Sequence, residues 1–294
     1  MKNTTAIIIS FLRPEYTKKC ITSLHKTYGA IRIIVAENGN YNKDLRKFCD
    51  KHDARYLLMP FDSGVCFARN RLMDEVQTEF VLVGDDDFMY SKEAEVDRMI
   101  KFLENHDEFD LIGGRIFERG AIRNYQGFIQ KQGDLLRYQK LDLDQCVLDG
   151  KTGLHYQACD LTFNFFVARH EAVKDVRWDE KIKVAYEHSD WFLNAKEHHI
   201  RVAFTSDAVV IHKPKLQKQV DDEYFKYRNR NSDREYFFKK HKISKAIDMN
   251  DRSDEIKFFA DKFYALKTMD FEGRTYNKGD IVQTKNPNEH MIPV

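Results

Sequence analysis

Short apolar runs alternate with helical stretches through the first ninety residues of the chain. Four apolar runs, each closed by a turn or a loop, span residues 5–11, 31–39, 55–60 and 79–87. Helical patterns, or loops that lead into a helix, fill the intervals at residues 15–28, 44–52 and 62–76. This alternation predicts βαβ units around a mainly parallel sheet, whose ligands collect at the carboxyl ends of the strands.

The pattern is less regular between residues 110 and 175. Residues 110–117 and 159–173 are predicted as strands, with a charged, glutamine-bearing stretch between them. A helix at residues 187–199 and a strand at 201–212 then restore the alternation. The end of the chain carries short alternating runs broken by polar turns, which predicts an appended module of two or three small strands.

Charge and cysteine content exclude several classes of protein. The 294 residues include 48 basic and 47 acidic side chains, so no global field recruits nucleic acid or an anionic membrane. Any such partner requires a local patch, and residues 213–245 supply one, with eleven lysines and arginines against five acidic residues. Five cysteines without a CxxC pair argue against a disulfide framework or a structural zinc site.

The hydropathy of the chain predicts a soluble protein. No stretch reaches eighteen consecutive apolar residues, and the apolar run after the first few residues is too short for a signal peptide. With its unpaired cysteines, the chain is expected in the cytoplasm, at most peripheral on the inner face of the membrane.

Three consecutive aspartates, Asp85 to Asp87, follow the apolar run "FVLV". The predicted strand carries them to the carboxyl edge of the sheet, where like charges at close range raise one another's pKa. A divalent cation such as Mg²⁺ or Mn²⁺ would relieve this repulsion, because it takes hard oxygen ligands from one or two carboxylates and from substrate phosphates. The triplet therefore suits a nucleotide-diphosphate substrate.

Six segments resemble a known family in both sequence and order. They are "IIISFLRPEY", "VAENGN", "DSGVCFARN", "VLVGDDDF", "EHSDWFL" and "VVIH". This series resembles the inverting glycosyltransferases of the GT-A fold, in particular the family-two bacterial polysaccharide transferases. Around "DDDF" and "EHSDWF" it is similar to β-1,4-N-acetylgalactosaminyltransferases. The resemblance covers residues 5 to about 212.

The resemblance implies a fold, a cofactor and a division of the chain. It implies an α/β, Rossmann-like GT-A domain at 1–245, with a mostly parallel sheet flanked by helices, and a small β-rich C-terminal module at 256–294. Within the domain, 1–110 would be the nucleotide-binding half, 111–212 the donor and acceptor half, and 213–245 a basic helical segment. The cofactor would be Mn²⁺ or Mg²⁺, and the donor a UDP-sugar carrying a hexose, an N-acetylhexosamine or a pentose.

The resemblance also assigns residues to the nucleotide. The loop after the first strand would meet the base and ribose, through Ser10, Phe11 and Arg13. Glu37 stands where such enzymes place an aspartate that accepts from the uracil N3–H, and it is one methylene longer. Arg69 would meet the base or the diphosphate, since its charge suits either, although a surface salt bridge is the alternative.

The acidic triplet and a distant histidine would hold the metal. By resemblance, Asp85 would contact the ribose and share in metal binding, and Asp87 would ligate the metal. Asp86 would face the nucleotide sugar or remain solvated. His212, at the end of "VVIH", occupies the position where the family supplies a further metal ligand, whereas a lone histidine after a strand is otherwise structural.

Inverting transfer needs a base that removes the proton of the acceptor hydroxyl. Related enzymes carry it in an "ED" pair at the start of a helix, and this chain has "YEHSDWF" instead. Glu187, His188 and Asp190 are therefore the candidates, and a carboxylate is favoured because the helix dipole stabilises an anion there. The alternative for these residues is a capping arrangement at the helix start.

Several acceptors fit this reading. The first is a bacterial surface glycan or lipid-linked saccharide, with the basic segment 213–245 against an anionic leaflet or a lipid phosphate. A second is hydroxymethylated DNA, as in phage-type glycosyltransferases, with the aromatic residues of that segment stacked on bases. In a third interpretation, which is favoured for the segment itself, it is an amphipathic helix packed on the domain. A non-catalytic carbohydrate-binding relic of the fold, or a nucleotidyltransferase, remains as an alternative function.

Overall fold

We analysed the protein as a computed structural model. It describes residues 1–123, 125–213, 222–228 and 231–250, and beyond them only the backbone of short strands between residues 253 and 293. The chain divides into two compact units, Met1–Asp254 and Glu255–Val294. Parts of the basic segment, residues 214–221, 229 and 230, lie outside the described residues.

The first unit is built on an eleven-stranded central sheet. Its main path has the order β10-β11-β13-β6-β12-β4-β1-β2-β3, with β5 paired to β13 and β7 to β6. The strands are β1 (Thr4–Ser10), β2 (Arg32–Glu37), β3 (Ala54–Leu58), β4 (Phe80–Val83), β5 (Phe88–Met89), β6 (Leu111–Glu118), β7 (Ala121–Arg123), β10 (Val147–Leu148), β11 (His155–Cys159), β12 (Phe166–Arg169) and β13 (Val202–His212).

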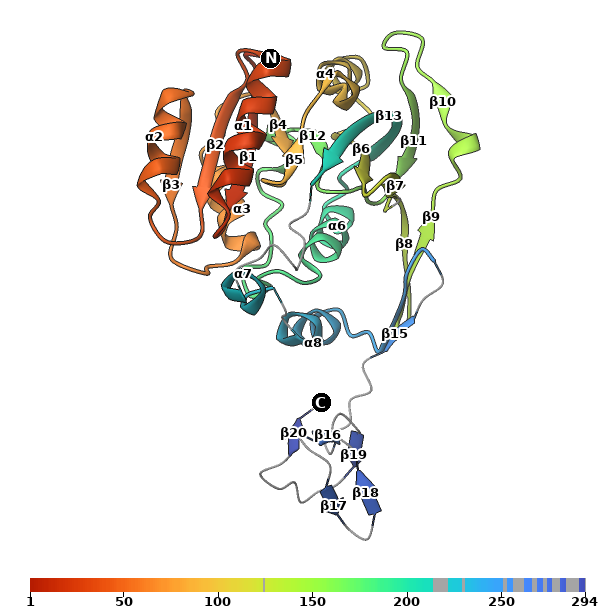
Figure 1. Cartoon of the computed structure of the whole chain (residues 1–294). Helices are drawn as coiled ribbons and strands as arrows, with labels where there is room; N and C mark the ends of the chain where they lie inside the picture. The colour runs from red at the N-terminus through yellow and green to blue at the C-terminus, as the bar shows by residue number, and fades with distance from the viewer. Residues whose placement is uncertain are drawn as a thin grey trace. The chain divides into compact units, whose positions relative to one another are not determined.

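The strand directions determine where loops gather. β3, β2, β1 and β4 are parallel neighbours, and so are β6 and β13, whereas β12 runs antiparallel between β4 and β6. The carboxyl ends of β1, β2 and β4 therefore meet at one edge. In Figure 1 the arrowhead of β2 lies on the side of the sheet where α7 is found, and Phe11, just after β1, contacts Tyr224 of α7 at a ring-centroid distance of 6.4 Å.

Helices connect the strands and flank the sheet (Figure 1). They are α1 (Pro14–Tyr28), α2 (Lys43–Lys51), α3 (Val65–Asp74), α4 (Val96–Asn105), α5 (His170–Val173), α6 (Glu187–Glu197), α7 (Asp222–Lys226) and α8 (Asn231–Lys240), with single 3-10 turns η1 (Lys92–Ala94) and η2 (Leu143–Gln145). α1 begins at Pro14, whose fixed φ suits a first helical position. α2 is capped by Asn42, whose side chain accepts from the Leu45 backbone N–H at 2.8 Å.

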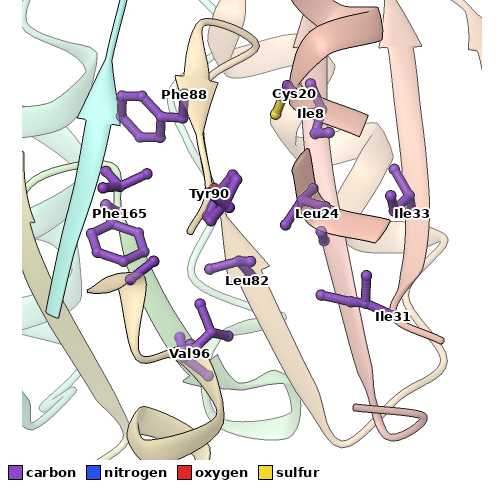
Figure 2. Close-up of a cluster of buried hydrophobic side chains, with 14 of the residues drawn as sticks. Ile8, Cys20, Leu24, Ile31, Ile33, Leu82, Phe88, Tyr90, Val96 and Phe165 are labelled. Carbon is purple, nitrogen blue, oxygen red and sulfur yellow. The ribbon is translucent and has the colours of Figure 1, made fainter. Parts of the chain in front are cut away.

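The core lies between α1 and the strands. Cys20 and Leu24, one turn apart on α1, face Ile8 of β1 and Ile33 of β2, as Figure 2 shows. All four side chains are buried. The 3.6-residue spacing in the sequence therefore marks the face of α1 that packs on the sheet.

The prediction of one strand over residues 159–173 is wrong in detail. β11 ends at Cys159, β12 covers Phe166–Arg169, and α5 begins at His170. Between these strands Leu161 leaves the central sheet and pairs with Gly127 of β8 (Gly127–Gln132). Two sheets compete for this segment, so its apolar run does not form one continuous strand.

A second sheet follows β7 and had not been expected. It has the order β15-β14-β9-β8 and comprises β8, β9 (Leu135–Lys140), β14 (Lys245–Ile247) and β15 (Ser253–Glu255). Gly133 lies in the two-residue turn between β8 and β9 with φ of 61°, a conformation that glycine adopts without steric cost. The Gly-Asp pair at this turn is the sequence signal that could have revealed the hairpin.

The second unit, Glu255–Val294, is described by its backbone strands alone. β16 (Lys262–Ala265) pairs with β19 (Ile281–Gln283) and β20 (Met291–Pro293), and β17 (Met269–Phe271) pairs with β18 (Arg274–Tyr276). The described part of this unit thus has five short strands, where the sequence pattern predicted two or three.

Candidate functional site

The three aspartates lie where β4 ends, beside the carboxyl end of β1. Asp86 and Asp87 are buried, at 1% and 5% exposure, whereas the Asp85 side chain is 39% exposed. Gly84 precedes them, and a Cβ there would stand 2.1 Å from the Tyr90 hydroxyl oxygen. A larger residue at position 84 would therefore displace the Tyr90 ring that packs beside the acidic triplet.

Arg13 provides positive charge inside the acidic triplet. Its Nη1 lies 2.7 Å from Asp87 Oδ2 and its Nε lies 3.1 Å from Asp86 Oδ2, and Nη2 also bonds Asp86. Burial opposes the charge on Arg13, but the two carboxylates outweigh it and raise the pKa of the guanidinium. From the sequence, a metal ion was expected to relieve the repulsion between the aspartates, and Arg13 was expected to contact the nucleotide. In the structure Arg13 itself pairs with two of them.

His212 closes the other side of Asp87. His212 Nε2 lies 3.3 Å from Asp87 Oδ2, and its Nδ1 lies 2.9 Å from Glu118 Oε2. Burial alone would lower the pKa of His212, but the hydrogen bonds and charges of Asp87 and Glu118 raise it. A carboxylate bonded to the second ring nitrogen is the arrangement that orients metal-binding histidines in proteins.

The fit of this corner to a cation depends on one atom. Asp87 Oδ1 is buried and has no hydrogen-bond partner among the described residues. An unpaired carboxylate oxygen beside a histidine nitrogen matches a hard divalent cation that completes its ligands from substrate phosphate. Within the described part of the chain, no group of three or more histidine, cysteine, aspartate or glutamate side chains could hold a metal by itself.

The buried acids of the triplet differ in proton affinity. Burial raises the pKa of Asp86 to about 7, although Arg13 opposes this shift. Burial would also raise the pKa of Asp87, but hydrogen bonds from His212 and Arg13 bring it below its ordinary value. Asp87 is therefore the better anion of the two.

Arg69 of α3 joins the acidic triplet to the start of α6. Its Nη2 lies 3.2 Å from Asp85 Oδ1, and its Nη1 lies 3.5 Å from Glu187 Oε1. The Arg69 side chain is only 3% exposed, so its guanidinium is buried even though the Asp85 side chain that it meets is partly exposed. Asn164 also approaches Glu187 Oε1, at 3.5 Å. Burial raises the pKa of Glu187, and the charge of Arg69 partly offsets that rise.

The three candidate bases occupy different surroundings. His188 is bonded through one ring nitrogen to Asn164, at 2.6 Å, and through the other to the Thr162 carbonyl. Burial lowers the pKa of His188 to about 3. Asp190 is buried against α8, where its Oδ1 lies 2.7 Å from both Lys240 Nζ and His241 Nε2. Of the three, only Glu187 presents a carboxylate to the cavities described next.

Two adjacent cavities meet at Glu187. The first, named here the aspartate cavity, has a volume of about 180 Å³, and its lining includes Arg13, Arg69, Asp85, Asp86, Asp87, Glu187 and His212. The second, the tyrosine cavity, has a volume of about 500 Å³ and is lined by Asp85, Ile116, Tyr125, Tyr138, Phe163, Asn164, Tyr186, Glu187, His188, Ser189, Ala246 and Asp248. Glu187, Asp85 and Asn164 belong to both linings.

Ser10 and Glu37 lie beneath the aspartate cavity, outside its lining. Glu37 accepts from the Gly39 backbone N–H at 2.9 Å and from Ser10 Oγ at 3.3 Å. Burial raises the pKa of Glu37 to about 7, against the effect of these bonds. The lining at this point comes instead from Ile9, Phe11 and Asn38.

α7 and the residues directly after it complete the lining of the aspartate cavity, a role that the sequence had not indicated. Tyr224 and Tyr227 lie in the lining, and the Tyr227 ring contacts Phe11 at 5.5 Å and Phe61 at 5.4 Å between centroids. The motif spacing could not place these rings, because α7 lies far along the chain from β1.

α8 packs on the domain. Phe237 stacks on Tyr186 at a centroid distance of 4.7 Å, and Phe237 and Phe238 are fully buried. Asp233 accepts backbone N–H bonds from Lys183, Val184 and Ala185, which braces the chain before α6. Phe237 and Phe238 of α8 thus serve packing on the domain.

The sequence is similar to that of known proteins. The sequence profile described as glycosyl transferase family 2 matches residues 5–174. The chain belongs to this family. The beta-1,4 N-acetylgalactosaminyltransferase 1 of Homo sapiens is 30% identical over 219 residues, which cover 71% of this chain and 38% of that protein. The beta-1,4 N-acetylgalactosaminyltransferase 2 of Mus musculus is 31% identical over 191 residues, 63% of this chain and 34% of that protein.

Solved structures agree on the fold of this glycosyl transferase family 2 chain. The crystal structure of S. aureus TarS superposes with a TM-score of 0.53 at 17% identity, over 72% of this chain and 37% of that one. TarS 1–349 in complex with UDP gives a TM-score of 0.51 at 17% identity, over 72% and 61% of the two chains. The predicted family and the α/β, GT-A fold are confirmed.

The chain spans about two fifths of the length of the curated relatives it matches. In the described residues, no helix combines the length and the apolar character that a membrane crossing requires. The structure has all five cysteines as free thiols.

Proposed function

We propose that this chain transfers a sugar from a UDP-sugar to a hydroxyl group of a saccharide, with inversion at the anomeric carbon and with the help of a divalent cation. The observation that carries the proposal is the position of Glu187 between two cavities. One cavity gathers the acidic triplet, Arg13 and His212, and the other is lined with aromatic rings. UDP in the TarS 1–349 complex and the names of the curated relatives support a UDP-sugar, with N-acetylgalactosamine as the first sugar to test.

The aspartate cavity is assigned to the UDP part of the donor. Phe11, Tyr224 and Tyr227 offer apolar surface to the base. Arg69 offers positive charge near the diphosphate. Asp87 and His212 would hold Mn²⁺ or Mg²⁺, with Asp85 as a further ligand or ribose contact. When bound, this cation would offset the negative charge that develops on the departing diphosphate.

The roles of Ser10 and Glu37 are modified by their burial. Both lie behind the cavity lining, so we assign them to supporting the base site rather than to a direct contact. Asp86, held by Arg13, is likewise assigned to holding the loop after β1 in place. Arg13 lines the cavity and pairs with two acids, which allows it to respond to an arriving diphosphate.

Glu187 is proposed as the base. The acceptor oxygen would form a bond to the anomeric carbon while the bond from that carbon to the diphosphate oxygen breaks, and the electron pair of that bond leaves with UDP. Glu187 would take the proton of the acceptor hydroxyl. A pKa raised by burial improves a carboxylate as a base, and Arg69 keeps it oriented.

His188 and Asp190 are less suited to this role. Both nitrogens of His188 are engaged in hydrogen bonds, and its lowered pKa makes it a poor proton acceptor. Asp190 is directed at Lys240 and His241 and lines neither cavity. We assign His188 to positioning Asn164 and Asp190 to anchoring α8.

A saccharide, on a bacterial surface glycan or a lipid carrier, is the proposed acceptor class. DNA is disfavoured because three of the rings that would stack on its bases, Tyr224, Phe237 and Phe238, are buried. A contact of the basic segment with an anionic leaflet stays a proposal, since much of that segment lies outside the described residues.

A nucleotide-sugar screen tests the proposal. A donor that binds the folded protein raises its thermal midpoint, so UDP-sugars are compared with GDP- and CMP-sugars in the presence of Mn²⁺ and in the presence of chelator. We expect a rise for UDP and at least one UDP-sugar that depends on Mn²⁺, followed by UDP release when saccharides are added. Absence of any UDP response would contradict the proposal.

A further inference from the structure

The tyrosine cavity continues away from the donor side. A third cavity of about 470 Å³, named here the Met249 cavity, is lined by Ile122, Arg123, Tyr125, Phe163, Asp248, Met249 and Asn250. It shares Tyr125, Phe163 and Asp248 with the tyrosine cavity. The aspartate, tyrosine and Met249 cavities therefore follow one another in that order. The tyrosine cavity shares lining side chains with each of the other two.

The walls of the tyrosine and Met249 cavities suit sugars. The Tyr125 ring lies 5.5 Å from Phe163 and 6.3 Å from Tyr138 between centroids, so several rings line one surface. Aromatic rings offer apolar faces to the C–H faces of sugar rings, and convergent polar groups then fix their hydroxyls. Asn164, Asp248 and Asn250 supply such groups along the series.

Two buried hydroxyls meet in the tyrosine cavity. The Tyr138 hydroxyl is buried, and its polar neighbour is Ser189, which already pairs with the Tyr125 hydroxyl at 3.0 Å. Buried hydroxyls of this kind are the polar groups that fix the orientation of a ligand in a ring-lined cavity. Burial keeps the pKa of Tyr138 well above its ordinary value, so the group remains a donor.

The second sheet builds this part of the wall. Tyr138 lies on β9, and Asp248 and Met249 follow β14 directly, which pairs with β9 in parallel. Tyr125 stands just before β8. Two segments more than one hundred residues apart thus meet at the groove, and neither contributes to the lining of the aspartate cavity.

We infer that the tyrosine and Met249 cavities form one groove for an acceptor of at least two sugar units. The inference rests on the proposed function, whose acceptor site it specifies. The sugar that receives the transferred unit lies in the tyrosine cavity, next to Glu187, and accepts a hydrogen bond from the Tyr138 hydroxyl. The next sugar lies in the Met249 cavity, against Ile122 and Met249.

A glycan array and a comparison of acceptor lengths test the groove. The full chain, with UDP and Mn²⁺, is applied to an array of mono- to tetrasaccharides, and KM is then measured for a retained disaccharide and for its terminal monosaccharide. We expect retention of di- and longer saccharides and a KM for the disaccharide at least about tenfold below that of the monosaccharide, which corresponds to about 1.4 kcal/mol.

Three variants locate the effect. Met249→Ala should reduce the ratio of monosaccharide KM to disaccharide KM by about tenfold, because it removes apolar contact with the second sugar only. Tyr138→Phe should raise both KM values by about tenfold, since it deletes one buried hydrogen bond. Val147→Ala, an exposed side chain on the edge strand β10, is the matched control and should behave as the unaltered protein.

Each result decides the inference. Equal KM values for the two lengths, a Met249→Ala effect that is the same for both, or no retained glycan in a protein that binds UDP would overturn the groove. UDP binding, measured in parallel, separates the two proposals. Retention of oligosaccharides by a protein that does not bind UDP would uphold the groove and contradict the transfer reaction, and absence of both would overturn both.

Discussion

The two cavities that meet at Glu187 are lined by different kinds of side chain. The aspartate cavity is lined largely by charged groups, and ion pairs hold them in place, such as the buried pair of Arg13 with Asp87 and the pair of buried Arg69 with the partly exposed Asp85. Rings are the commonest side chains in the lining of the tyrosine cavity, and part of its wall comes from a hairpin and a strand near residue 246. Charge dominates the first side and shape dominates the second.

This difference teaches which changes should affect which step. Ion pairs that are buried fix geometry tightly, and loss of one partner leaves a charge uncompensated. Changes on the charged side should therefore alter donor binding and turnover. Rings that stack on sugars contribute smaller, separable energies, so changes on the aromatic side should alter the choice of acceptor.

The largest effect is expected at the charged end, from Asp87→Asn. The isosteric amide keeps the shape of the side chain but removes the anion beside His212, so transfer should fall by at least about a thousandfold through the loss of charge stabilisation. The Mn²⁺-dependent part of UDP binding should disappear with it. UDP release and calorimetric UDP binding, with Mn²⁺ and with chelator, measure the two losses.

Asp50→Asn is the control for this change, because Asp50 lies on α2 in an exposed pair with Arg46. It should leave both measurements as they were. Full activity of the unaltered protein in chelator would contradict the metal role of Asp87.

At the junction of the two sides, Glu187→Gln should separate binding from turnover. Removal of a general base should lower the turnover rate by about a hundredfold or more, while UDP still binds. The pKa of Glu187 is raised by burial, and a base must be ionised to act. Turnover of the unaltered protein should therefore rise with pH through a value above that of an ordinary glutamate.

Glu197→Gln, an exposed position at the far end of the same helix, should retain full turnover. If Glu187→Gln keeps its turnover and its pH profile, the base lies elsewhere.

Asp190→Asn should act on stability instead of on chemistry. Asp190 compensates Lys240 and His241 where α8 meets α6, so its loss should lower the free energy of unfolding by about 3 kcal/mol. Urea unfolding measures this change, and the protein that remains folded should still bind UDP. A stable Asp190→Asn protein without turnover would instead mark Asp190 as the base.

The contrast between the two sides also explains what the sequence could predict. Asp85 to Asp87 directly follow a strand of apolar residues, and His212 ends another, so their meeting at one sheet edge follows from strand direction alone. Phe163, Phe165 and Phe166 belong to one apolar run of the sequence. Phe165 and Phe166 are fully buried, but Phe163 lies in the lining of the tyrosine cavity.

Long-range contacts account for what the sequence did not predict. Arg13 follows β1 and could have faced the nucleotide alone, and its pairing with Asp86 depends on a seventy-residue separation that no local pattern encodes. From the sequence, Asp190 and Glu187 are equivalent candidates for the base because both lie at the start of one helix. The structure distinguishes them, because Lys240 of α8 pairs with Asp190. The wall of the tyrosine cavity requires β9 to pair with β14. The charged, glutamine-bearing stretch that contains β9 has no periodic pattern that would predict this pairing.

The smallest expected effect concerns Glu37, behind the charged side. Burial raises its pKa to about 7 from 4.5, so the folded protein binds more protons than the unfolded chain between these values. The contribution of Glu37 to stability is complete below pH 4.5 and is lost as pH rises, by about 2 kcal/mol between pH 5 and pH 7. Glu37→Gln, which still accepts the Gly39 bond, should remove this slope and be the more stable protein at pH 7.5. Urea unfolding of both proteins at several pH values measures the difference, and parallel pH profiles would show that Glu37 titrates as an ordinary exposed acid and that this side of the site is wetter than its packing implies.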